Sequence, residues 1–232
     1  MVYFWLNNIQ SILYPARCVL CDDAGADGLD LCAGCRADLP RLTAACDRCA
    51  AALPPTARVS RCPECARRPP PFTAARAALH YATPVDWMIW QLKFRRRLTH
   101  GRTLGALLAE RVAAGPDRPE ALVPVPLHAR RWRERGYNQA AEIAAETGRR
   151  LGLPVWHRAA RRVRPTARQA ELPAARRPAN VRGAFAAAPQ VAGRHVAIVD
   201  DVATTARTAA ALARTLRAAG ARRVDLYCAA RA

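Results

Sequence analysis

The stretch HVAIVDDVATTARTAAALARTL, residues 195–216, decides the fold of the longer part of this chain. It opens with an apolar run typical of a buried strand, reaches two adjacent carboxylates, passes through three threonines and continues as a helix. In parallel α/β sheets, ligands bind beyond the carboxyl ends of the strands, where loops lead into helix N-termini. The stretch therefore predicts a binding site at Asp200 and Asp201.

The loop after this acid pair has the composition of a phosphate-binding loop. Its peptide N–H groups and the hydroxyls of Thr204, Thr205 and Thr208 can surround a phosphate at the positive end of the following helix. Two carboxylates would repel a bare anion, so they fit a ligand whose phosphate is attached to hydroxyl groups, such as ribose 5-phosphate. The alternative is that the two acids only cap the helix.

Strands alternate with helices through the rest of this part of the chain. Helical faces are marked by Val85, Met88, Ile89 and Leu92, after a start at Thr83 and Pro84, and by Leu104, Leu107, Leu108 and Val112. Further helices are expected at 138–150 and 205–219, and strands at 77–81, 121–125, 154–157, 181–186, 196–199 and 224–229. This order predicts an α/β fold whose sheet is mainly parallel.

Eight of the nine cysteines form four C-x-x-C knuckles: Cys18 and Cys21, Cys32 and Cys35, Cys46 and Cys49, Cys62 and Cys65. Two knuckles complete a closed four-sulfur site, so four knuckles predict two structural zinc ions. Disulfides and iron–sulfur clusters are the alternatives, which a reducing cytoplasm and the cysteine spacing disfavour. Short loop closure favours pairing successive knuckles, and an interleaved order stays open. Cys228 is expected to be a buried small hydrophobe.

Composition and charge indicate the domain boundary, the classes of partner and the compartment. A proline-rich connector at 66–75 divides an amphipathic segment plus double zinc ribbon, residues 1–68, from an α/β domain, residues 69–232. The net charge of +19 would attract nucleic acid, an anionic membrane surface or phosphorylated metabolites, although an arginine- and alanine-rich composition alone gives such a charge. No stretch reaches membrane-spanning length and the first residues lack signal-peptide features, so a cytoplasmic protein is expected.

Three segments carry a resemblance to known families. VAIVDDVATTART resembles the phosphoribosyl diphosphate (PRPP) motif of type I phosphoribosyltransferases. LVPVPLHARRWRERGYNQAAEIA and RRPANVRGAF resemble the ComF family of competence-related, GntX-like proteins, which carry an N-terminal double zinc ribbon. The resemblance covers nearly the whole chain. It implies a type I phosphoribosyltransferase-like, mainly parallel sheet with flanking helices behind the ribbon.

The resemblance also implies roles for named residues. Asp200 and Asp201 would bind ribose hydroxyls, with a magnesium ion held by the diphosphate, and Lys93 matches a basic position. The 5-phosphate would be held by Ala203, Thr204, Thr205, Ala206, Arg207 and Thr208, and the diphosphate loop would be Val125, Pro126, Leu127 and His128. A mobile loop would begin at Arg135, Gly136, Tyr137, Asn138 and Gln139, with Arg135 neutralising the departing diphosphate. Gln169, Arg177 and Asn180 fall in a hood over the reacting carbon.

One departure from the family concerns Ala206, which stands where the phosphate loop usually has glycine. If the position needs a positive φ, Ala206 carries strain of about 1 kcal/mol; if the turn is right-handed, Arg207 adds charge instead.

The sequence and the resemblance leave three functions open. The first is a PRPP-binding protein of DNA uptake that acts beside a competence helicase and contacts single-stranded DNA. The second is an active phosphoribosyltransferase with an unidentified acceptor, and the third is a zinc-ribbon nucleic-acid adaptor with a vestigial PRPP site.

Overall fold

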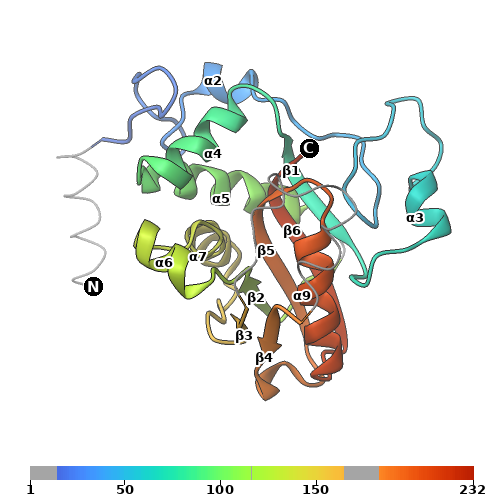
Figure 1. Ribbon diagram of the computed structural model, residues 1–232. Helices are drawn as coiled ribbons and strands as arrows, with labels where there is room; N and C mark the ends of the chain where they lie inside the picture. Colours follow the sequence, from blue (N-terminus) through green and yellow to red (C-terminus); the bar gives the residue numbers. More distant parts are fainter. Residues whose placement is uncertain (1–14, 116, 165–182) are drawn as a thin grey trace.

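The computed structural model describes residues 15–115, 117–164 and 183–232. The stretch that decides the fold forms strand β5 (His195–Ala203) and helix α9 (Arg207–Ala218). β5 lies inside a four-stranded sheet of order β1-β6-β5-β2, with β1 at Ala75–His80, β2 at Ala121–Pro124 and β6 at Arg223–Arg231 (Figure 1). Every neighbouring pair in this sheet is parallel, as predicted.

Helices cover both faces of the sheet, which is why its strands are apolar on both sides. Helices α4 (Val85–Phe94), α5 (Leu98–Ala113) and α7 (Gln139–Leu151) share one apolar cluster with alternate residues of the central strands. Helix α9 shares the other cluster with the intervening strand residues, and both layers are visible in Figure 1. The predicted α/β class is therefore confirmed. Among the described residues, no helix combines the length and the apolarity needed to cross a bilayer.

The predicted apolar faces are confirmed and several boundaries differ. All eight apolar residues assigned to the faces of α4 and α5 are buried. Helix α4 begins at Val85, with Pro84 at the N-cap; the Thr83 hydroxyl donates to Asp86 Oδ2 and not to the backbone, and Asp86 N donates to Ala82 O at 3.2 Å. The strand predicted at 154–157 is only an isolated bridge between Val155 and Leu122.

Three short elements differ from the sequence prediction. The described part of the strand predicted at 181–186 is β4 (Phe185–Ala187), which pairs antiparallel with β3 (Ala160–Arg162) outside the main sheet. Helix α6 (Ala129–Arg135) was not predicted because its arginine-rich sequence has no apolar periodicity. The 3₁₀ turn at Pro189–Val191 is too short to leave a pattern.

The cysteine-rich ribbon packs directly on the α/β layers. It contains the short helices α2 (Ala33–Ala37) and α3 (Pro63–Arg67), and Leu29, Leu31 and Leu39 join the apolar cluster of α4 and α5. Between its two halves, residues 40–42 bond to the edge strand β1, where Leu42 N donates to Ala78 O at 3.1 Å. The ribbon and the sheet therefore share one core.

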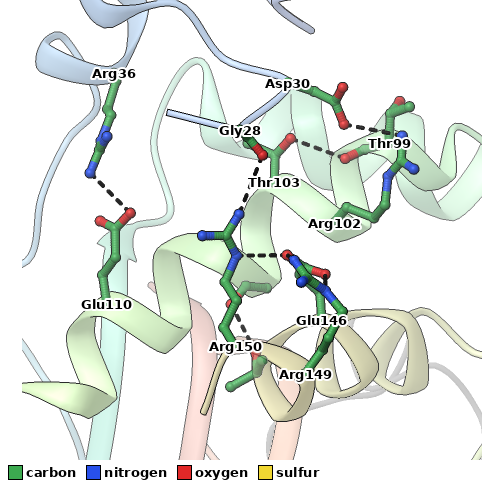
Figure 2. Close-up of polar contacts among 12 residues, drawn as sticks. Gly28, Asp30, Arg36, Thr99, Arg102, Thr103, Glu110, Glu146, Arg149 and Arg150 are labelled. Atoms are coloured by element: carbon green, nitrogen blue, oxygen red, sulfur yellow. Dashed lines mark hydrogen bonds and ion pairs between the residues drawn. The ribbon is translucent and has the colours of Figure 1, made fainter. Parts of the chain in front are cut away.

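Ion pairs fasten the ribbon along helix α5, as Figure 2 shows. Arg36 Nη2 lies 3.0 Å from Glu110 Oε1, and Arg102 Nη2 lies 3.1 Å from Asp30 Oδ2. Arg150 of α7 donates to the Gly28 carbonyl at 3.4 Å. These pairs are partly solvated, so they set the seating of the ribbon more than its stability.

Candidate functional site

The two acids at the carboxyl end of β5 face different surroundings, because successive side chains of a strand point to opposite faces. Asp200 lines a cavity together with residues 202–209, and its Oδ1 accepts from Asp201 N at 2.9 Å. Asp201 is 4% exposed and turns to helix α4, where Lys93 Nζ lies 2.8 Å from its Oδ2. The structure thus brings Lys93 to the acid pair and separates the two carboxylates.

The surroundings also change the pKa values of Asp200 and Lys93. Burial, and then the negative charge of Asp201, raise the pKa of Asp200 to about 8, although Lys93 and Arg162 oppose the rise. Burial lowers the pKa of Lys93, but the charge and hydrogen bond of Asp201 outweigh this and raise it. Lys93 therefore stays protonated beside Asp201, while Asp200 retains a proton at neutral pH until a partner satisfies its charge.

This raised pKa predicts that Asp200→Asn stabilises the chain above neutral pH. An unfolded aspartate has a pKa of about 3.9, so through the window up to about pH 8 the folded state holds a proton that the unfolded state has released. The contribution of Asp200 to the free energy of unfolding is therefore greatest below the unfolded pKa and is lost as the pH rises towards the folded pKa. We expect the D200N chain to melt with the wild type near pH 4 and about 5 °C higher at pH 8.5, measured by differential scanning fluorimetry. Equal melting temperatures at pH 8.5 would contradict the raised pKa.

The loop between β5 and α9 encloses a small cavity. The cavity has a volume of about 100 Å³ and is lined by Asp200 and by residues 202–209. Helix α9 begins in this loop, at Arg207. Ala206 has φ 51° and ψ 16°, so the left-handed alternative is the one that the structure adopts, at a cost of about 1 kcal/mol for a residue with a Cβ. The loop therefore keeps a turn that glycine would form without strain.

The segment 125–128 follows β2 and lies beside β5, as the sheet order requires. Val125 N donates to Val199 O at 2.9 Å, and Asn138 Nδ2 donates to Val125 O at 3.0 Å. His128 caps helix α6 through its Nδ1, which accepts from Arg130 N at 3.3 Å. Val125 thus lies beside the end of β5, next to the acid pair.

The residues at which the resemblance begins a mobile loop run from the end of helix α6 to the start of helix α7. Arg135 ends helix α6, and its Nη1 donates to Gln139 Oε1 at 2.9 Å. Asn138 caps helix α7, where its Oδ1 accepts from Ala140 N at 3.0 Å. Arg135 and Gln139 therefore bond to each other, and Asn138 caps a helix. Gln169, Arg177 and Asn180 lie outside the described residues.

Sequence reasoning missed two arginines beside the acids. Arg162 of β3 lowers the pKa of Asp200 by its charge and lies over the Phe185 ring at 5.5 Å. Arg231 at the end of β6 contacts the loop itself, where its Nη1 donates to Ala203 O at 2.8 Å. In a chain with 37 basic residues, nothing in the sequence distinguishes these two from solvated arginines. Cys228, opposite Asp200 in β6, is fully buried, as expected.

The eight knuckle cysteines form two four-sulfur clusters, Cys18, Cys21, Cys32 and Cys35 in the first and Cys46, Cys49, Cys62 and Cys65 in the second. The order is successive, so the interleaved alternative is excluded. Tetrahedral zinc with bonds of about 2.3 Å needs sulfurs about 3.8 Å apart. Cys21 Sγ lies 3.6 Å from Cys32 Sγ, and Cys49 Sγ lies 3.8 Å from Cys62 Sγ. Both clusters therefore fit zinc.

Peptide N–H groups support the thiolate form at one cysteine of each cluster. Burial opposes ionisation of Cys18, but backbone hydrogen bonds outweigh it and lower its pKa to about 6. The same balance lowers the pKa of Cys46 to about 7. In each cluster one cysteine thus favours the thiolate form, which is the form that binds a metal ion.

Helix α4 presents an aromatic face to solvent, which sequence reasoning also missed. Trp87, Trp90 and Phe94 project opposite the buried stripe and are 42%, 44% and 51% exposed. The Arg95 guanidinium lies 5.5 Å from the Trp90 ring, and that of Arg135 lies 5.4 Å from the Phe94 ring. The helical spacing of the three aromatics was the available signal. Lys93, which pairs with Asp201, lies on the same helix.

Comparisons with known proteins agree with this architecture. Residues 9–66 match the double zinc ribbon domain. The chain is 32% identical over 220 residues to DNA utilization protein YhgH of Salmonella typhimurium, and 35% identical over the same length to YhgH of Escherichia coli K12. Each match covers 92% of this chain and 96% of the relative. Competence protein F of Haemophilus influenzae is 34% identical over 211 residues, which cover 87% of this chain and 90% of that protein.

Two solved structures match part of the chain with low TM-scores. The glutamine PRPP amidotransferase of B. subtilis, complexed with ADP and GMP, has a TM-score of 0.40 and 23% identity over 56% of this chain and 26% of that chain. A structure described as the allosteric regulatory enzyme of purine biosynthesis has a TM-score of 0.38 and 23% identity over 56% of this chain and 25% of that chain.

Proposed function

The chain belongs to the ComF family, with DNA utilization protein YhgH and competence protein F among its relatives, and from this we propose that it is a cytoplasmic PRPP-binding protein of DNA handling. One observation carries the PRPP site: a carboxyl with a raised pKa, Asp200, lines the cavity that the 203–209 loop forms at the start of helix α9. A phosphate at a helix N-terminus and a hydroxyl-bearing group beside a buried acid are the two halves of ribose 5-phosphate.

In this proposal the loop and the acids divide the ligand between them. Peptide N–H groups of the loop and the N-terminus of α9 hold the 5-phosphate, and Asp200 accepts hydrogen bonds from the ribose hydroxyls. Lys93 neutralises Asp201, so the ligand meets one uncompensated acid and not two. The proposal directs the diphosphate towards Arg135 and the segment 125–128, whose Val125 N donates to Val199 O of β5.

A magnesium ion fits the oxygen donors of such a ligand. Magnesium prefers carboxylate and phosphate oxygens and retains several waters. Asp201 already pairs with Lys93, so Asp200 is the protein carboxylate left for the ion or its waters, and the diphosphate supplies the other oxygens. When bound, the ion would neutralise the diphosphate charge.

Calorimetric titration with PRPP, with and without magnesium, tests this function. We expect saturable binding that magnesium strengthens, and ribose 5-phosphate as a weaker competitor. No binding of either ligand would overturn the proposal and favour an adaptor with a vestigial site. Diphosphate release in the presence of purine, pyrimidine and amine acceptors would identify an active transferase; PRPP that stays intact with all of them would support a binding protein.

The aromatic face of α4 favours single-stranded DNA as the second ligand. Successive bases stack on exposed aromatic rings, while flanking arginines follow the phosphates. Trp90 carries the Arg95 guanidinium on its ring, and Arg96 and Arg97 continue the positive charge beyond the end of the helix. This face offers both stacking surfaces and positive charge. The stacking surfaces favour single strands, because the bases of duplex DNA are already paired and stacked on one another.

We therefore expect Trp90→Ala to weaken single-stranded DNA binding about tenfold, because stacking contributes about 1–3 kcal/mol per base. Trp90→Phe should restore most of the affinity, and the salt slope should be unchanged in both variants because no charge is removed. Fluorescence anisotropy with a labelled oligonucleotide at several salt concentrations measures both quantities. A Trp90→Ala chain that binds single strands like the wild type would reject this face.

A further inference from the structure

Strand β6 ends in an arginine that joins the second zinc cluster to the proposed phosphate loop. Arg231 Nε donates to the carbonyl oxygen of Cys49 at 3.1 Å. Its Nη1 donates to Ala203 O at 2.8 Å and also contacts Thr204 O and Ala232 O, and Ala203 O accepts a second hydrogen bond from Ala232 N at 3.2 Å. One guanidinium thus holds a zinc-binding knuckle on one side and two peptide groups of the loop on the other.

These bonds fix the direction of two N–H groups. A trans peptide is planar, and its C=O and N–H point in opposite directions. The peptide that carries Ala203 O also carries Thr204 N–H, and the peptide that carries Thr204 O also carries Thr205 N–H. Because Arg231 contacts both carbonyls, the Thr204 and Thr205 N–H groups point away from its guanidinium, and both residues line the cavity.

The other end of Arg231 is held by the backbone of the second cluster. Cys49 is one of its four ligands, and the next residue, Ala50, is 1% exposed in the same apolar cluster as Ala203 and Ala209. Zinc binding fixes the Cys49 knuckle and with it the carbonyl that Arg231 contacts. The first cluster packs elsewhere, since Cys18, Cys32 and Cys35 belong to the apolar cluster of α4 and α5 on the opposite face of the sheet.

We propose that Arg231 is a positioning residue through which zinc in the second ribbon orients the Thr204 and Thr205 N–H groups for a ligand phosphate. The inference rests on the proposed function, because the 203–209 loop must bind the phosphate. It assigns the two zinc ions different roles: the first holds the ribbon on the helices, and the second also sets phosphate affinity.

Arg231→Met tests the coupling, because methionine keeps the apolar stem and removes every donor. We expect the R231M chain to retain both zinc ions, measured by inductively coupled plasma mass spectrometry, and to bind ribose 5-phosphate about tenfold more weakly in calorimetry. The Thr204 and Thr205 amide resonances should respond to ribose 5-phosphate in the wild type and lose most of that response in R231M. Arg231→Lys, which keeps one donor group, should recover part of the affinity.

A double-mutant cycle separates coupling from general damage. Cys62→Ser, which opens the second cluster, should weaken ribose 5-phosphate binding in the wild type and add little in R231M, whereas Cys21→Ser in the first cluster should act independently of R231M. An R231M chain with wild-type affinity, or additive effects of C62S and R231M, would overturn the coupling and leave the PRPP site standing. A wild-type chain that binds neither PRPP nor ribose 5-phosphate would overturn the proposed function itself.

Discussion

Replacing Asp200 by asparagine should lower the affinity of the chain for PRPP about 10- to 100-fold without harming the fold. A hydrogen bond to a charged group contributes about 1.5–3 kcal/mol, and each 1.4 kcal/mol is a factor of ten in affinity. Asparagine keeps the shape of the side chain but loses the charge that ribose hydroxyls would satisfy. Calorimetry with PRPP and magnesium at pH 8.5, above the raised pKa of Asp200, measures the wild type with this carboxyl largely ionised.

The stability of the D200N chain makes this experiment decisive. Because the substitution should raise the melting temperature above neutral pH, a loss of affinity cannot be attributed to unfolding. Asp117→Asn is the matched control: Asp117 is exposed and pairs with Arg223 at 2.8 Å, at the opposite end of the sheet. Asp201→Asn is a poorer probe, since it would leave Lys93 without its partner. If D200N binds PRPP as tightly as the wild type, the ribose contact is wrong.

The sequence predicted the location of this acid pair better than the division of labour within it. The apolar run, the acids and the threonines are contiguous, so strand, loop and helix could be derived from local periodicity. The pairing of Asp201 with Lys93 joins β5 to α4, and no local pattern records such a contact. Sequence adjacency suggested that both acids act alike, whereas the alternation of side chains in a strand gives each a different face.

The same contrast holds for the ribbon. Ligand geometry is local in a C-x-x-C knuckle, so the cysteine spacing predicted both clusters, and the favoured successive order is confirmed. Its position on α5 depends on ion pairs such as that between Arg36 and Glu110. Because the chain has many arginines, the sequence does not indicate which of them pairs with a given carboxylate. The aromatic face of α4 was readable in its spacing, but apolar periodicity draws attention to the buried stripe first.

Removal of zinc should unfold the ribbon and uncover the helices beneath it. The free energy of zinc binding in small zinc-binding domains, about 10–16 kcal/mol, is coupled to their folding. Apart from cysteines, the buried residues in the described part of this ribbon belong to apolar clusters that it shares with the α/β layers. Three of its buried leucines, Leu29, Leu31 and Leu39, share an apolar cluster with Leu104 and Leu107 of α5. Chelation should therefore expose α5 as well as the ribbon, with increased binding of a hydrophobic dye, loss of near-ultraviolet circular dichroism and rapid tryptic cleavage at the ribbon arginines.

The two clusters should differ in how far the damage spreads. Cys21→Ser should release the first zinc ion and the leucines that lie between its knuckles, so its dye binding should approach that of the chelated protein. Cys62→Ser should release the second ion with a smaller dye signal, because the apolar cluster of α4 and α5 keeps the first ribbon. Cys228→Ala, a cysteine outside both clusters, should keep two zinc ions per chain. A metal-free chain that stays protease-resistant would show that the shared core, and not zinc, holds the ribbon in place.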